Sequence, residues 1–129
     1  MSKKNRSPLK GPRSAAFLRQ KGLCYYCNKP MWQNNMEQYA SLHGISLARA
    51  KHFRCTGEHL VAHSEGGAAS NGNIVAACLF CNQGRHKRKN PPCPAEYANL
   101  VQKRLERGAW NSHLLKWRHH QPVAQVKAN

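Results

Sequence analysis

Two C-x-x-C pairs are the residues of this 129-residue chain whose chemistry is easiest to define. They consist of Cys24, Cys27, Cys78 and Cys81. Two intervening residues let both thiolates of a tight turn bind the same ion, and two such turns complete a tetrahedron. Four soft thiolates select zinc, and an ion whose four positions are all filled by protein is structural. The alternatives are a redox dithiol and buried cysteines without metal.

A second group of polar residues contains no thiolate. Glu58 and His59 are adjacent, and Asn82 and His86 lie four residues apart, on one face of a predicted helix. A hard cation such as Mg²⁺ needs only one or two protein oxygens when phosphate and water supply the rest, and Glu58 and Asn82 can provide them. On a strand, His59 points away from Glu58 and can take a proton from water. Asn73 can orient that imidazole through a side-chain or backbone oxygen.

The charge of the chain indicates a polyanionic partner. Lys and Arg number 21 against five carboxylates, all of them Glu, which gives a formal net charge of +16. Nucleic acid is the commonest such partner, and the alternative is a basic tail that only maintains solubility. The candidate phosphate contacts are Arg85, Lys87, Arg88, Lys89 and the loop residue His63. No apolar run is long enough to span a membrane and no secretory signal is visible, so we expect a cytoplasmic protein with reduced thiols.

Short elements must position these residues. We expect helices over residues 14–20, 79–88 and from Pro94 to about 107, and strands over 53–61 and 74–77 with a Gly66-Gly67 loop between them. Two further short helices, capped by Asn35 and Ser46, are expected within residues 35–52. This pair resembles a helix-turn-helix, and the alternative is a helical insertion that packs on the core. Of the remaining cysteines, we expect Cys55 in a strand and Cys93 in a loop.

The order of these residues resembles the HNH nuclease motif, the ββα-metal fold, in its four-cysteine zinc-stabilised form. The resemblance covers residues 24 to about 88. It implies that His59 is the general base, that Asn73 is the central Asn of the motif, and that Asn82 is a metal ligand. Glu58 falls on a metal-ligand position where the family most often has Asp, so its carboxylate is carried by one additional methylene.

Three further positions match the same motif. Gly66 and Gly67 fall on its Gly-Gly loop, and Arg85 falls on the basic residue that follows Cys-Asn by three positions. His86 matches a second helical His that some members of the family use as a metal ligand. The resemblance therefore implies His86 as a further candidate ligand.

Together these observations predict a small α+β fold: a ββα-metal core with a four-cysteine zinc site, a helical insertion and flanking helices. We expect a basic flexible tail over residues 1–12, a nuclease domain over 13–107 with its insertion at about 35–52, and a basic C-terminal extension over 108–129. The expected activity is hydrolysis of phosphodiester bonds in DNA, in preference to RNA, with structural Zn²⁺ and catalytic Mg²⁺ or another divalent cation. The alternatives are a non-catalytic zinc-knuckle module that binds nucleic acid and a helix-turn-helix-like regulator. The pattern specifies neither a cleavage sequence nor an oligomeric state.

Overall fold

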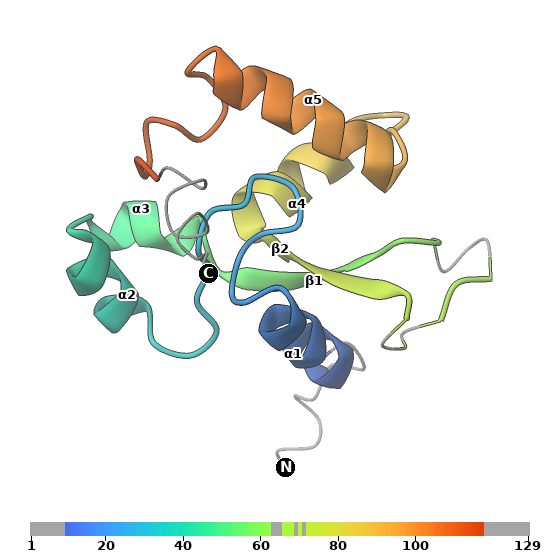
Figure 1. Cartoon of the computed structure of the whole chain (residues 1–129), viewed down its shortest axis with the longest axis horizontal. Helices are drawn as coiled ribbons and strands as arrows, with labels where there is room; N and C mark the ends of the chain where they lie inside the picture. Colours follow the sequence, from blue (N-terminus) through green and yellow to red (C-terminus); the bar gives the residue numbers. More distant parts are fainter. Residues whose placement is uncertain (1–9, 63–65, 69, 71, 118–129) are drawn as a thin grey trace, which may run out of the picture.

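The two-stranded sheet lies between helices (Figure 1). The computed structural model describes residues 10–62, 66–68, 70 and 72–117. The elements are α1 (Lys10–Arg19), α2 (Met36–His43), α3 (Leu47–Lys51), β1 (Cys55–His59), β2 (Ile74–Cys78), α4 (Leu79–His86) and α5 (Pro94–Glu106). Helix α1 lies on one side of the sheet and α4 on the other, with α5 beyond α4. The predicted small α+β fold is confirmed.

The strands form an antiparallel pair, with the Glu-His pair at the end of β1 and the second cysteine pair at the junction of β2 and α4. Cys55 faces Cys78, Glu58 faces Val75 and His59 faces Ile74. Every residue of β2 is buried, because helices cover both sides of the sheet. Strand β1 is shorter than the expected 53–61. It starts late because the N–H of Phe53 donates to the carbonyl of Ala50 in a turn and cannot join the ladder.

Helix α1 begins earlier than the sequence suggested. It starts at Lys10, so residues 10–12, which were expected in the basic tail, are helical. Gly11 and Pro12 are tolerated there because the first N–H groups of a helix have no intrahelical partner to lose. Ala16 of this helix is fully buried against the core. Residues 1–9 of the predicted tail lie outside the described part of the chain.

The insertion forms the two capped helices that were predicted. The side chain of Asn35 accepts a hydrogen bond from the N–H of Gln38, and that of Ser46 from the N–H of Arg49. Between them Gly44 takes a left-handed conformation with φ of 64°, which ends α2. Helix α3 has only five residues, and its Ala50 packs into the core. The insertion therefore contributes to packing on the core.

A glycine allows α5 to approach α4 closely. A Cβ atom at Gly84 would lie 2.8 Å from the hydroxyl oxygen of Tyr97 and 3.1 Å from a ring carbon of Trp110. Helix α5 has Cys93 as its N-cap residue and Pro94 in its first turn, as expected. Gly84 therefore reflects close packing and not a break in α4.

Part of the basic C-terminal extension packs on the domain. Leu114 and Leu115 are buried in the core, and the Lys29 ammonium donates to the carbonyls of Asn111 and Leu115 at 3.1 and 2.8 Å. Residues 118–129 lie outside the described part of the chain. No helix in the described ranges combines the length and the apolar character needed to cross a bilayer.

Candidate metal centres and active-site cavity

The four cysteines of the C-x-x-C pairs meet at one buried point. Their Sγ atoms all lie within 4.8 Å of one another, and the Cys27 and Cys78 sulfurs are 3.9 Å apart. A tetrahedron with Zn–S bonds of about 2.3 Å has edges of about 3.8 Å. The residues present therefore fit a zinc ion with four thiolate ligands. Cys55 and Cys93 lie in β1 and before α5, outside this cluster, as expected.

Backbone N–H groups already point at two of these sulfurs. The N–H groups of Tyr26 and Cys78 donate to the Cys24 sulfur at 3.4 and 3.3 Å, and the N–H of Cys81 donates to the Cys78 sulfur at 3.5 Å. Burial raises the pKa of each of the two thiols, Cys78 and Cys81, well above the ordinary value for cysteine. Such thiols ionise together only when a cation compensates their charge, which again fits zinc.

Lys29 supplies positive charge beside the cluster. Its side chain is buried, and burial lowers the pKa of its ammonium group while the neighbouring Cys27, Cys78 and Cys81 act in the opposite direction. A zinc ion with four thiolates carries net negative charge, which a buried ammonium offsets. Lys29 was not among the residues predicted to act at this site. Its position two residues after the first C-x-x-C pair was the available signal.

A second site lies where β1 ends against α4. A cavity of about 600 Å³ opens there. Its walls come from the end of β1, from one face of α4 and from the turn before α5, and include Glu58, His59, Asn82, Arg85, His86 and Cys93. The structure thus brings four of the residues singled out in the sequence, Glu58, His59, Asn82 and His86, to one cavity.

Glu58 is held by three donors. Its side chain is only 3% exposed. Oxygen Oε2 accepts hydrogen bonds from the Tyr26 hydroxyl at 2.8 Å and from Arg85 Nη1 at 3.0 Å. Oxygen Oε1 lies 2.9 Å from Nε2 of His86, whose side chain is 53% exposed. Oε2 therefore faces the protein, and Oε1 is the oxygen on the open side.

The amide of Asn82 has a defined orientation. The Thr56 hydroxyl donates its proton to the carbonyl of Ala77 at 2.7 Å, so it can only accept from Asn82, whose Nδ2 lies 2.8 Å away. The Gly57 carbonyl, 3.4 Å from Nδ2, also requires a donor. The carbonyl oxygen of Asn82 therefore points away from β1, and it accepts no hydrogen bond within the described residues. Glu58 and Asn82 both line the cavity, and a carboxylate oxygen and an amide oxygen are ligand types that a hard divalent cation accepts.

Asn73 fastens the loop that follows β1. Its Oδ1 accepts from the N–H of Val61 at 2.7 Å, and its Nδ2 donates to the carbonyls of Val61 and Ala68 at 3.0 and 2.9 Å. Its backbone carbonyl accepts from the N–H of Leu60 at 2.8 Å. A Cβ atom at Gly67 would collide with the Val61 carbonyl and lie 2.7 Å from Nδ2 of Asn73, so this clamp requires glycine there. Both polar atoms of the Asn73 side chain are thus bonded to the loop backbone.

The predicted phosphate contacts differ in exposure. Arg85 is 12% exposed, and besides Glu58 its Nε donates to the Pro92 carbonyl at 2.9 Å, so this residue braces the site. Arg88 lies over the ring of Tyr97 at 6.0 Å. Lys87 and Lys89 are exposed. His63 lies outside the described residues.

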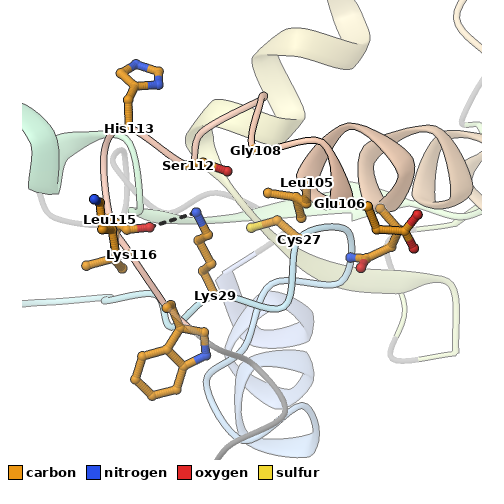
Figure 2. Close-up of a pocket in the computed structure, with 11 residues that line it drawn as sticks. Cys27, Lys29, Leu105, Glu106, Gly108, Ser112, His113, Leu115 and Lys116 are labelled. Atoms are coloured by element: carbon orange, nitrogen blue, oxygen red, sulfur yellow. Dashed lines mark hydrogen bonds between the residues drawn. The ribbon is translucent and has the colours of Figure 1, made fainter.

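A larger cavity, of about 740 Å³, lies between the turn of the first C-x-x-C pair (residues 24–30, the knuckle), α5 and the C-terminal segment (residues 108–117) (Figure 2). Lys29 extends through it to the Leu115 carbonyl. The Ser112 hydroxyl in its wall donates to the Ala109 carbonyl at 2.7 Å. The hydrogen bonds of these two side chains hold the C-terminal segment, and the Glu-His pair lies in the other cavity. The larger of these two cavities is therefore not the one that contains the residues predicted to act in catalysis.

Comparison with known proteins identifies a family for part of the chain. Residues 48–88 match the HNH endonuclease family, a segment that runs from α3 through both strands to the end of α4 and the two residues beyond. No curated protein and no solved structure matches the chain. The matched segment includes Glu58, His59, Asn73, Asn82 and the second cysteine pair. The first cysteine pair lies outside it, and the cluster of four sulfurs connects that pair to the segment.

Proposed function

We propose that the chain is a metal-dependent endonuclease that hydrolyses phosphodiester bonds in DNA, because residues 48–88 match the HNH endonuclease family. The observation that carries the proposal is the cavity at the end of β1, where Glu58, His59, Asn82 and His86 meet. A carboxylate, an amide carbonyl and imidazoles in one cavity are the groups that metal-assisted phosphodiester hydrolysis requires. The excess of basic residues supports a polyanionic substrate.

In this proposal Glu58 and Asn82 hold the divalent cation. Glu58 contributes Oε1 while Tyr26 and Arg85 retain Oε2, and Asn82 contributes its carbonyl oxygen. His86 is within reach as a further ligand, because its ring already contacts Oε1 of Glu58. When bound, Mg²⁺ or a similar cation supplies positive charge that stabilises the phosphate and the leaving 3′-oxygen.

His59 acts as the general base. It is the last residue of β1, next to Glu58, and it lines the same cavity. Its imidazole takes a proton from water, which then attacks the phosphorus. Asn73 keeps the chain beyond His59 in place by fastening Leu60 and Val61. Asn73 therefore supports the base through the backbone that follows it.

Exposed lysines beside the cavity contact the phosphates that flank the cleaved bond. Lys87 and Lys89 follow α4 directly and are exposed, and Arg88 stands between them. Contacts of this kind position a nucleic acid without reading its sequence. They would serve a non-catalytic zinc-knuckle module equally well, so a functional test must separate cutting from binding.

The test is cleavage of a supercoiled plasmid after chelation and addition of Mg²⁺ or Mn²⁺. We expect nicking or linearisation that depends on the added cation. Asn82→Ala should reduce it by about 100-fold or more, with unchanged zinc content. Gln83→Ala is the matched control, because Gln83 is the exposed neighbour of Asn82 on the same helix. Plasmid binding without cutting under every divalent cation would refute the endonuclease and favour the zinc-knuckle module.

A further inference from the structure

We propose that Tyr26 is a positioning residue that connects the structural zinc site with the catalytic carboxylate. It does so by fixing Oε2 of Glu58, so that Oε1 is the oxygen presented to the divalent cation. The inference rests on the proposed function, because it concerns how that cation is held. Tyr26 lies within the first C-x-x-C pair, outside the segment that matches the HNH family.

Tyr26 has contacts with both sites at once. Its backbone N–H donates to the Cys24 sulfur at 3.4 Å, and its hydroxyl donates to Oε2 of Glu58 at 2.8 Å. Its carbonyl accepts from the Gln102 side chain at 2.7 Å. Its ring packs edge-on against Tyr97, with centroids 4.8 Å apart and planes at 88°. The residue is fully buried and fixed at the backbone, at the ring and at the hydroxyl.

The hydroxyl of Tyr26 is the donor in its contact with Glu58, because a carboxylate oxygen can only accept a hydrogen bond. At 2.8 Å this hydrogen bond is a directional constraint on Oε2.

Two donors on one oxygen decide which oxygen is available. Tyr26 and Arg85 both donate to Oε2, whereas within the described part of the chain Oε1 is hydrogen-bonded to the half-exposed imidazole of His86 alone. Without the hydroxyl, Arg85 alone would orient Oε2, and one charged donor permits the carboxylate to rotate. Cation binding would then have to order the carboxylate, at a cost that the wild-type chain avoids.

The experiment measures Mn²⁺ affinity directly, from the electron paramagnetic resonance signal of the free ion, on zinc-loaded full-length protein. Tyr26→Phe keeps the ring and the backbone contacts and removes only the hydroxyl. We expect it to weaken Mn²⁺ binding by about tenfold or more, as loss of one hydrogen bond to a charged group implies. Zinc content and the far-ultraviolet circular dichroism spectrum should not change.

Tyr97→Phe is the matched control. The Tyr97 hydroxyl is also next to the zinc site, where it donates to the Cys81 carbonyl at 2.8 Å, but it is bonded to no atom of Glu58. This variant should bind Mn²⁺ within about twofold of wild type. Equal weakening in both variants would indicate general loosening of the knuckle and would overturn the inference.

The outcomes separate this inference from the proposed function. A wild-type chain that binds Mn²⁺ and cuts DNA, combined with unchanged Mn²⁺ affinity in Tyr26→Phe, overturns the role of Tyr26 alone. A wild-type chain that neither binds Mn²⁺ nor cuts DNA overturns the proposed function, and the inference with it.

Discussion

Replacing Glu58 with Gln tests the buried carboxylate with almost no change in shape. The amide can place its oxygen at the Oε2 position, where Tyr26 and Arg85 donate. Its NH₂ group then occupies the Oε1 position and faces His86 Nε2, which can accept a hydrogen bond in its other tautomer. The three contacts therefore survive, and what is lost is the negative charge.

The expected loss of stability in Glu58→Gln follows from the loss of this charge. A hydrogen bond to a charged group contributes about 1 kcal/mol more than one between neutral groups. The Tyr26 contact loses that difference, and the Arg85 contact changes from a buried ion pair to a hydrogen bond with one charged partner, so Glu58→Gln should lower the free energy of unfolding by about 2 kcal/mol. In addition, an NH₂ group in place of Oε1 repels a cation. Metal-dependent cutting should therefore fall far more than stability does.

Urea denaturation of the zinc-loaded protein measures the first effect, and plasmid cleavage measures the second. Glu37→Gln is the control, because Glu37 lies exposed in the first turn of α2 and should change stability by no more than about 0.5 kcal/mol. If Glu58→Gln unfolded at the same urea concentration as wild type, the charge of Glu58 would not stabilise the fold through Tyr26 and Arg85. Wild-type cutting by this variant would contradict the role of Oε1.

Two further predictions concern the zinc site and the loop. Cys78→Ala should unfold the domain, because it leaves an incomplete tetrahedron of ligands, whereas Cys93→Ala, outside the cluster, should leave the domain folded. Circular dichroism and zinc analysis of the two variants measure this difference. An unchanged melting temperature for Cys78→Ala would rule out a structural role for zinc. Asn73→Asp should lower stability by about 2 kcal/mol, nearly as much as Asn73→Ala, because a carboxylate oxygen would face the Val61 and Ala68 carbonyls in place of the amide donor. Unfolding of Asn73→Asp at the wild-type urea concentration would show that the clamp is not needed.

The sequence predicted the parts of the fold that depend on local chemistry. Asn35 and Ser46 cap helices because their side chains accept nearby N–H groups, a relation contained within four residues. The spacing of the two C-x-x-C pairs predicted their convergence because the geometry of a metal leaves few alternatives. These predictions required no knowledge of distant contacts.

The contacts that the sequence did not predict are between distant residues. The hydrogen bond between Tyr26 and Glu58 joins positions 32 apart, and Lys29 donates to carbonyls more than 80 positions away. Arg85, which was predicted to contact phosphate, donates to Glu58, because α4 turns this residue toward β1. Such pairings follow from how α4, β1 and the knuckle pack, which no local pattern encodes.

The most direct test of the account is the rate of plasmid cutting by His59→Ala with saturating Mg²⁺. Loss of a general base should reduce the rate by about 100- to 10,000-fold, while plasmid binding and zinc content match wild type. His113→Ala is the control, because His113 is exposed and lines the other cavity, and it should cut at the wild-type rate. Wild-type cutting by His59→Ala would contradict the account.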